Sequence, residues 1–359
     1  MNNPFMEGGY LSSNVSINKL FIEKMPTNKV KQDLQGKTAM DIFSTELFIN
    51  EIKKNSKDLK LDINNLEEKM FPQYLDNLLQ SDDLLVKKKA NNIVRLFGES
   101  LGVILLTLKK AENENRLKRK DWGDKEWEFW STIENIILVG GLASSNIGES
   151  FKYYIEKVFK DSGEKSYNIM LIKDSSNIGI KGCAAYIKGV SKGKTYLIFD
   201  CGQTFIKRSL VKIDDSGVRD IRNLTKVLSK HVEWNFKNIE EERNEAGNLH
   251  KHILNTILDT VEIAKEEEND NIGDTIVINI ANYVRNGAFV NRGGYGKLRL
   301  IAHDCEKYLS SVLYEKLKKS FCIKLVHDGT AMANAFLDYP NSVCISLGTA
   351  FGVGFPVKN

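Results

Sequence analysis

The sequence feature that most constrains the fold is a set of short apolar segments, each followed by a polar or glycine-rich turn. Their length and their β-branched residues predict buried strands. Amphipathic segments separate most of them, so the chain is predicted to be an α/β protein. In open α/β sheets, ligands bind beside the carboxyl ends of the strands. The predicted strands are residues 136–139, 167–173, 196–199, 205–213, 276–280, 323–326, 342–347 and 351–355.

Apolar residues at three- and four-residue spacing predict the helices. These are residues 40–56, 64–80, 82–112, 147–160, 178–189, 236–268, 302–319 and 331–336. The most apolar long stretch, residues 93–108, contains Arg95 and Glu99 and is too short and too charged to span a bilayer. The first residues lack a basic segment followed by an apolar run, so neither a signal peptide nor membrane association is expected.

The composition is that of an ordinary globular protein, with 42% hydrophobic and 27% charged residues in a chain of 359. The 51 basic and 47 acidic residues are too evenly balanced to indicate a nucleic acid as the main partner. The five cysteines are odd in number and form no CxxC pair, which argues against a disulfide framework or structural zinc. A reducing, cytoplasmic location is expected.

Residues 111–131 are highly charged and contain Trp122, Trp127 and Trp130. A basic and aromatic stretch of this kind could contact nucleic acid. The alternative is a surface loop whose tryptophans cover an edge of the core. The interleaved acidic residues would repel phosphates, so the surface loop is the favoured interpretation.

The segment F-D-C-G-Q-T-F-I-K, residues 199–207, places a carboxylate at the end of a predicted strand and follows it with a small polar turn. Gly202 would let backbone N–H groups approach phosphate oxygens, and Thr204 could donate through its hydroxyl. Asp200 could hold Mg²⁺ through water. The alternative is a β-hairpin with an acidic turn.

Three further turns have the same position at strand ends. The segment L-G-T-A-F-G-V-G, residues 347–354, could form a second phosphate cradle or a glycine-rich hairpin. The segment I-L-V-G-G-L-A-S-S, residues 137–145, could let a flat ligand or phosphate lie against the backbone, or form a tight turn. In V-H-D-G-T-A, residues 326–331, Asp328 is placed for a general base or for a helix N-cap.

Together these four segments resemble the superfamily of actin, sugar kinases and heat-shock ATPases. D-C-G-Q-T resembles its first phosphate motif, L-G-T-A-F-G its second and L-V-G-G its adenosine motif. H-D-G-T-A is similar to the segment that carries the catalytic aspartate in hexokinase-like and ROK-family sugar kinases. The resemblance covers most of residues 130–359. It implies a two-lobed actin-like ATPase fold, which is ribonuclease H-like.

The order of the motifs differs from that family, in which the adenosine motif comes last. Here it comes first, and the other three follow residues 188–194. The end of the chain, residues 353–359, would continue naturally into residues 1–11. A circular permutation is therefore inferred, because domain termini often lie close together at the surface.

The resemblance also implies a division into lobes. Residues 1–174 and 320–359 would form the larger, adenosine-binding lobe. Residues 195–319, with the helix at 178–189, would form the smaller lobe with the first phosphate motif. Residues 188–194 would be a linker at the permutation join.

In that family two lobes close on ATP and Mg²⁺, and an aspartate takes the proton from the hydroxyl that attacks the γ-phosphate. Asp328 would be this base, and Asp200 would hold the metal ion. The residues expected to bind the nucleotide are Asp200, Gly202, Gln203, Thr204, Lys207, Gly348, Thr349, Gly352, Gly140 and Gly141.

The acceptor is expected near Asn282, Asn286, Arg292 and His327, because asparagine offers both a donor and an acceptor to sugar hydroxyls. Arg292 and Lys297, in the glycine-rich segment 291–297, would instead suit an acidic acceptor or the triphosphate. Three departures from the family stand out. His327 replaces an asparagine that contacts the sugar, Ala350 replaces a glycine, and the ROK zinc cluster is absent, so zinc is not expected.

The leading hypothesis is an ATP-dependent kinase that phosphorylates a hydroxyl of a small, sugar-like molecule. One rival is a nucleotide-driven switch or assembly ATPase of the same fold, and another is a sugar- or nucleotide-sensing protein without turnover. Fold alone does not separate them. The sequence leaves open whether the protein forms a homodimer.

Overall fold

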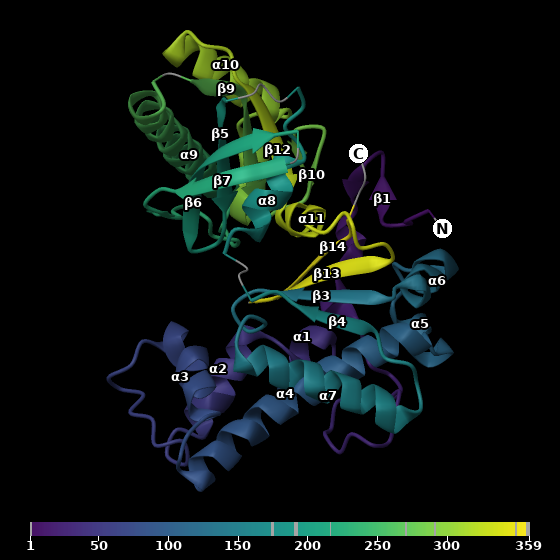
Figure 1. The fold of residues 1–359 in the computed structure, drawn as a ribbon. Coiled ribbons are helices and arrows are strands. Elements are labelled where there is room, and N and C mark those ends of the chain that lie inside the picture. Colours follow the sequence, from purple (N-terminus) through teal and green to yellow (C-terminus); the bar gives the residue numbers. More distant parts are fainter. Residues whose placement is uncertain are drawn as a thin grey trace. The chain divides into compact units, whose positions relative to one another are not determined.

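The computed structural model shows a mixed α/β protein (Figure 1). It describes residues 2–173, 176–189, 193–215, 217–269, 271–290, 292–348 and 350–356. The chain divides into two compact units, each built from three separate segments. Unit 1 comprises Met1–Phe5, Asn14–Ser176 and Tyr339–Val353. Unit 2 comprises Met6–Ser13, Asn177–Asp338 and Gly354–Asn359.

Unit 2 is built on a twisted sheet with the strand order β12-β9-β5-β6-β7, in which β8 also pairs with β6. Its strands are β5 (Thr195–Cys201), β6 (Phe205–Asp214), β7 (Gly217–Asn223), β8 (Val227–Leu228), β9 (Ile272–Ile280) and β12 (Cys322–His327). Strands β5, β9 and β12 are parallel, whereas β6 is antiparallel to β5. The carboxyl ends of β5, β9 and β12 therefore meet at one edge of the sheet.

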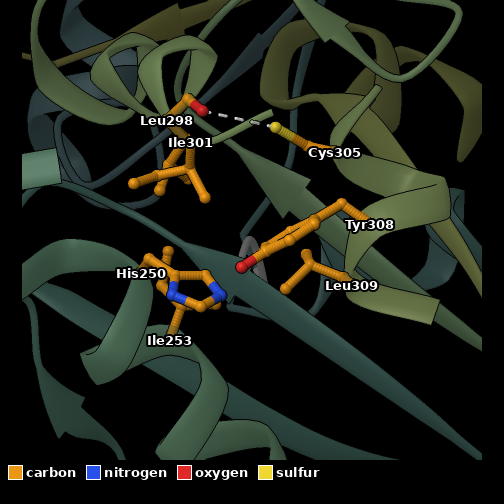
Figure 2. A pocket seen from close by; sticks show the side chains of 7 residues that line it. All are labelled: His250, Ile253, Leu298, Ile301, Cys305, Tyr308 and Leu309. Carbon is orange, nitrogen blue, oxygen red and sulfur yellow. Dashed lines mark hydrogen bonds between the residues drawn. The ribbon is translucent and has the colours of Figure 1, made fainter. Parts of the chain in front are cut away.

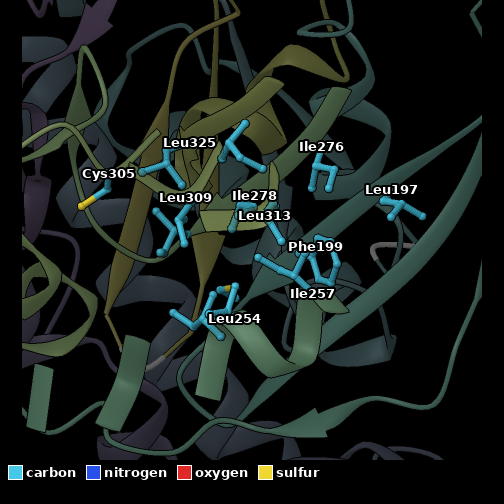
Figure 3. Packing of buried hydrophobic residues seen from close by; sticks show 14 of the residues in the cluster. Leu197, Phe199, Leu254, Ile257, Ile276, Ile278, Cys305, Leu309, Leu313 and Leu325 are labelled. Atoms are coloured by element: carbon cyan, nitrogen blue, oxygen red, sulfur yellow. The ribbon is translucent and has the colours of Figure 1, made fainter. Parts of the chain in front are cut away.

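The two faces of this sheet are covered by different helices. Leu197 and Phe199 pack with α9 (Ile239–Glu267) and α10 (Cys305–Leu317) in one apolar cluster (Figure 3). Ile198, between them in the strand, packs on the opposite face with α8 (Ile178–Ala184) and α11 (Asp328–Asn334). This division follows from the two-residue period of a strand, which sends successive side chains to opposite faces.

Unit 1 contains a smaller sheet with the strand order β14-β13-β3-β4. Its strands are β3 (Asn135–Val139), β4 (Asn168–Leu171), β13 (Ser342–Leu347) and β14 (Phe351–Gly354). Strands β13, β3 and β4 are parallel. The helices α1 (Ala39–Ile42), α2 (Thr45–Lys54), α3 (Phe71–Leu78), α4 (Leu84–Lys110) and α7 (Asn146–Ser162) also belong to this unit.

Helix α4 is the centre of unit 1 and lies beside α7 (Figure 1). Gly98 and Gly102, one turn apart, allow this approach, since a Cβ on either would lie 2.8 Å from the Cβ of Tyr154 or Val158. In the described part of the chain, α4 is the one helix long and apolar enough to cross a membrane. Its apolar window is 72% buried inside the protein, so α4 packs as a core helix of unit 1.

The tryptophan-rich segment is helical rather than the expected loop, but its tryptophans pack into the core as expected. It forms α5 (Asn113–Lys118) and α6 (Asp124–Thr132), and Trp122, Trp127 and Trp130 are buried. The Arg119 guanidinium lies 4.3 Å from the Trp122 ring, and the Trp122 indole donates to the Asn14 carbonyl at 2.7 Å. Buried rings cannot stack on nucleotide bases, so the burial removes the argument for nucleic-acid contact.

The remaining described elements are short. They are the strands β1 (Met6–Glu7), β2 (Tyr10–Leu11), β10 (Val284–Arg285) and β11 (Ala288–Phe289), and the 3₁₀ helices η1 (Ser13–Val15), η2 (Ile17–Lys19), η3 (Glu68–Met70) and η4 (Gly294–Leu300).

The expected larger lobe includes three segments that belong to unit 2 instead, which are residues 6–13, 320–338 and 354–356. Strand β12 pairs with β9 over six residues and brings residues 320–338 into unit 2. The reason is that apolar strand character does not specify a partner. In the expected linker, residues 190–192 lie outside the described residues.

Two glycine substitutions test the packing of unit 2. Gly182 in α8 would place a Cβ 1.6 Å from the Ala331 carbonyl oxygen of α11, whereas Gly247 in α9 faces open space. We expect Gly182→Ala to lower the free energy of unfolding by about 2 kcal/mol or more. Gly247→Ala should raise it by about 0.5–1 kcal/mol, since alanine favours a helix interior. Urea denaturation measures both, and an undisturbed Gly182→Ala variant would contradict the close approach of α8 and α11.

Candidate active site

The carboxyl edge of the sheet in unit 2 gathers the polar residues of three strands. Asp200 of β5 is opposite Asn279 of β9, and Ile280 is opposite His327 at the end of β12. Asp328 follows directly as the first residue of α11. The structure therefore places Asp200, His327 and Asp328 at one sheet edge, together with Asn279. An amide at the end of a predicted central strand was the signal that could have identified Asn279.

The Asp200 carboxylate is held by two partners in unit 2. Its Oδ1 accepts a hydrogen bond from Asn279 Nδ2 at 2.9 Å, and its Oδ2 accepts one from Lys207 Nζ at 2.8 Å. Lys207 is directly opposite Asp200 in the β5–β6 ladder, which explains the ion pair. The lysine side chain remains 49% exposed and the aspartate 18% exposed. This carboxylate is therefore oriented at the strand end.

Asn279 carries an unsatisfied polar atom at this edge. The residue is only 2% exposed, and its Oδ1 has no hydrogen-bond partner among the described residues. Leaving a buried polar atom unpaired costs about 1–3 kcal/mol. An amide oxygen beside a carboxylate is a donor set that fits Mg²⁺, which binds proteins through oxygen.

Within the described residues, no group of three or more His, Cys, Asp and Glu side chains is arranged to hold a metal ion. Mg²⁺ commonly takes only one or two carboxylates and completes its shell with water and substrate phosphates. Asp200 and Asn279 are therefore matched to a metal ion that arrives with a phosphorylated ligand.

The turn after β5 differs from the expectation in one respect. The Gly202 N–H donates to the Phe205 carbonyl at 3.1 Å and closes the β5–β6 turn, so it is not available to a phosphate. Gln203 and Thr204 are exposed, and their backbone N–H groups have no partner among the described residues. These two N–H groups and the Thr204 hydroxyl are the donors that the turn can offer.

Two hydroxyl groups stabilise this turn by donating hydrogen bonds to it. Ser229 Oγ donates to the Gly202 carbonyl at 2.7 Å, and Tyr295 OH donates to the same carbonyl at 2.8 Å. Both interactions fix the orientation of the peptide that precedes Gln203. The phosphate-binding candidate is therefore a braced turn whose Gln203 and Thr204 residues are exposed.

Asp328 has one anchored and one open carboxylate oxygen. Its Oδ1 accepts a hydrogen bond from the Gly329 N–H at 2.7 Å and lies 3.2 Å from His327 Nε2. Its Oδ2 has no hydrogen bond to a described residue. Desolvation by the surrounding chain raises the pKa of Asp328, although the side chain itself is 38% exposed. Nearby Asp200 acts in the same direction, while His327 and the Gly329 N–H oppose the shift. The N-cap of α11 is His327, so the alternative role of Asp328 as N-cap is wrong.

His327 is held on both sides of its ring. It is 8% exposed, and its ring stacks on Tyr283 with the centroids 4.2 Å apart. Its Nδ1 accepts a hydrogen bond from the Thr330 N–H at 3.2 Å. Burial lowers the pKa of His327, so the ring is neutral at neutral pH.

The predicted substrate residues occupy different environments. Asn282 is 4% exposed, and both polar atoms of its side chain lack a partner among the described residues. Asn286 lies in the exposed turn between β10 and β11 with φ at 50°, and Arg292 is exposed. Asn291 lies outside the described residues. A substrate role for these residues stays a prediction, for which the unpaired Asn282 amide offers the best physical argument.

Lys297 is not available to a ligand. It is completely buried, its Nζ donates to the His231 carbonyl at 2.5 Å, and it lies 4.6 Å from the Phe236 ring centroid. Burial lowers the pKa of Lys297, although Glu233 opposes this shift. The suggested contact of Lys297 with a triphosphate is therefore wrong, because its charge is used inside unit 2.

In unit 1, the parallel pairing of β3 and β13 brings two predicted glycine turns together. Gly140 has φ at 101°, and a Cβ there would lie 2.8 Å from the Leu347 carbonyl oxygen, so only glycine fits. Gly141 is exposed with open space around it. The Gly348 carbonyl accepts from the Thr45 N–H at 3.1 Å. Thr349 lies outside the described residues.

Two other features of this edge bear on phosphate binding. The Gly352 N–H donates to Ser346 Oγ at 3.1 Å. At the start of α7, the Ile147 N–H donates to Asp76 Oδ1 at 2.8 Å, and Asn146 Nδ2 donates to Asp76 Oδ2 at 3.0 Å. A carboxylate therefore already occupies this helix N-terminus, which leaves the glycine turn better suited to an uncharged part of a ligand.

A small apolar pocket lies elsewhere in unit 2. Figure 2 shows His250 and Tyr308 in its wall, with their ring centroids 5.3 Å apart, and the Cys305 thiol donating to the Leu298 carbonyl at 3.6 Å. None of the residues predicted to bind nucleotide or substrate lines this pocket. The pocket is a small gap where α9, η4 and α10 pack together, and it is not part of the candidate site.

Comparison with known proteins identifies no family. No protein-family model matches the chain, and no curated protein sequence matches it. Function is therefore argued from the chemistry of the polar edge.

The raised pKa of Asp328 makes a prediction about stability. A carboxyl whose pKa is higher in the folded than in the unfolded state destabilises the fold at pH values above the folded pKa. We therefore expect Asp328→Asn to have a higher free energy of unfolding than the wild type at pH 7. This difference should disappear as the pH falls through the pKa of Asp328 in the folded protein. Denaturation midpoints across pH measure this, with Asp220→Asn on the exposed strand β7 as the control. A less stable Asp328→Asn variant at pH 7 would contradict the predicted direction.

Proposed function

We propose that this protein is an ATP-dependent phosphotransferase that transfers the γ-phosphate to a hydroxyl of a small, sugar-like molecule. The observation that carries this proposal is the convergence of Asp200, Asn279 and Asp328 at the carboxyl ends of adjacent parallel strands. A metal-binding carboxylate and a separate carboxylate with one open oxygen are the two acidic groups that phosphoryl transfer requires. We place the enzyme in the cytoplasm.

We further propose an actin-like ATPase fold, ribonuclease H-like and circularly permuted. Internal similarity supports this, since both sheets have the same neighbour pattern: β6-β5-β9-β12 in unit 2 and β14-β13-β3-β4 in unit 1. In unit 2 these strands occur along the chain as a hairpin pair followed by two parallel strands. In unit 1 the corresponding pair comes at the end of the chain and the two parallel strands come earlier.

In this proposal the phosphates of ATP bind the turn after β5 through the free N–H groups of Gln203 and Thr204 and the Thr204 hydroxyl. Asp200 and Asn279 hold Mg²⁺, directly or through water. When bound, Mg²⁺ neutralises the charge of the phosphates.

Asp328 is assigned the role of general base. Its Oδ2 removes the proton from the acceptor hydroxyl while the oxygen of that hydroxyl forms a bond to the γ-phosphorus. The bond from the γ-phosphorus to the bridging oxygen breaks, and ADP leaves. The raised pKa of Asp328 brings its basicity closer to neutral pH, which favours proton transfer. The unpaired Asn282 amide is assigned to the acceptor hydroxyls, since it offers both a donor and an acceptor.

The direct test combines an acceptor screen with Asp328→Asn. We expect ADP release that depends on one member of a panel of sugars and polyols, and a decrease of about 10²–10⁴-fold in that rate for the variant. Affinity for ATP–Mg²⁺, measured by calorimetry, should change little because the Asp200 turn remains intact. Asp220→Asn is the matched control. Nucleotide hydrolysis that no acceptor stimulates would favour a switch ATPase and reject the kinase.

The second test concerns Asn282. Replacing a buried, unpaired amide by an apolar side chain of similar size removes a desolvation cost. We therefore expect Asn282→Leu to raise the free energy of unfolding by about 1–3 kcal/mol. The KM for the acceptor should rise roughly tenfold, which corresponds to about 1.4 kcal/mol of lost binding. Asn235→Leu, at an exposed position, is the control. An unchanged KM would remove Asn282 from the acceptor site.

A further inference from the structure

Trp234 differs from the other tryptophans of the chain because it is exposed. Trp122, Trp127 and Trp130 are buried in unit 1, whereas Trp234 in unit 2 is 51% exposed. Its indole Nε1–H has no hydrogen-bond partner among the described residues. An indole left open to water loses hydrophobic free energy, and tryptophan is enriched where proteins bind other molecules.

Two consecutive glycines cover one face of this indole. A Cβ on Gly293 would lie 2.7 Å from the ring atom Cε3, and a Cβ on Gly294 would lie 2.9 Å from Cζ2. Cε3 and Cζ2 are on opposite sides of the six-membered ring, so the peptide between the glycines crosses one face of the indole. The φ angles of 74° and 49° also favour glycine at both positions. Since half of Trp234 remains exposed, the opposite face is open to solvent.

The two segments that form this arrangement both contact the phosphate turn. Ser229, in the segment before Trp234, donates from its N–H to the Thr204 carbonyl at 3.0 Å. Tyr295, directly after the two glycines, donates from its hydroxyl to the Gly202 carbonyl at 2.8 Å. The indole is therefore held by segments that also brace the candidate site.

The glycine segment also leads back to the residues assigned to the acceptor. The Val290 N–H donates to the Tyr283 carbonyl at 2.9 Å, and Tyr283 follows Asn282, whose unpaired amide is assigned to the acceptor hydroxyls. The ring of Tyr283 stacks on His327, the neighbour of Asp328, with the centroids 4.2 Å apart. This connection favours the acceptor over the nucleoside as the ligand of the open indole face.

We propose that Trp234 is a stacking platform for the ring of a cyclic sugar, which is the acceptor of the kinase reaction. This inference rests on the proposed function and narrows its substrate class. The C–H groups of a sugar ring form an apolar face that is attracted to the negative face of an indole, while the hydroxyls point outward to polar partners. The Nε1–H of Trp234 supplies one further donor. An acyclic polyol presents no rigid face, and ordering it costs conformational entropy.

Fluorescence quenching tests this contact without turnover. Iodide reaches exposed indoles, so in the wild type it reports on Trp234, because the other three tryptophans are buried. We expect at least one of glucose, galactose, mannose and N-acetylglucosamine, added with ADP–Mg²⁺, to protect Trp234 from iodide, and its alditol to protect it less. Trp234→Phe, which lacks the reporting indole, should show no sugar-dependent change. Protection by ADP–Mg²⁺ alone, or by none of the four sugars, would overturn the inference.

Two variants measure the effect on the reaction. For Trp234→Ala we expect the KM for the protecting sugar to rise about threefold to tenfold, as for the loss of one aromatic contact. The kcat, the KM for ATP and the free energy of unfolding should change little. Trp234→Phe should keep part of the sugar affinity because it retains a ring. Tyr314→Ala, at an exposed aromatic residue of α10, is the control.

The outcomes distinguish this inference from the proposed function. Phosphoryl transfer with an unchanged sugar KM in Trp234→Ala would overturn the platform and leave the kinase standing. A rise in the KM for ATP instead of the sugar would assign the indole to the nucleoside and would also overturn it. A sugar that protects Trp234 without being phosphorylated would reject the kinase and leave a sugar-binding site.

Discussion

The parallel pairing of β5, β9 and β12 is the constraint on which the candidate site depends. Pairing in register places Asp200 opposite Asn279 and Ile280 opposite His327, so residues distant in sequence end at one sheet edge. The apolar clusters on the two faces of the sheet hold that register, since a shift of one residue would turn each apolar side chain to the wrong face. The same strand register therefore determines both the packing of the core and the positions of the polar residues at the sheet edge.

The same edge contains several groups that oppose stability. Asp328 has a raised pKa, and the side chains of Asn279 and Asn282 carry buried polar atoms without partners among the described residues. Such groups normally find a partner in a folded protein. At the end of β9, a bound metal ion, phosphate or hydroxyl would satisfy the side chains of Asn279 and Asn282. Sites that bind polar ligands commonly contain groups that lower the free energy of unfolding of the unliganded protein.

Sequence patterns predicted most of the regular structure and part of the site. The strands β3, β5, β6, β9 and β12 and the helices α4, α7, α9 and α10 were expected from apolar spacing, which depends only on neighbouring residues. The assignment of residues 320–338 was wrong because any buried strand can pair with any other. The tryptophan segment was mistaken for a loop because its charged residues masked the short helices α5 and α6.

What the sequence determined by itself is local: which segments are strands, and that Asp200, Gly202, Asn282 and Asp328 follow strand ends. The tertiary structure alone decided which of those ends are neighbours, that the Gly202 N–H closes a turn and that Lys297 is buried. It also decided the surroundings of His327, whose Nδ1 accepts a hydrogen bond from the Thr330 N–H and whose ring stacks on Tyr283. The physical reason is that hydrogen-bond partners and desolvation depend on groups brought close in space, whereas periodicity and turn chemistry depend on groups close in the chain.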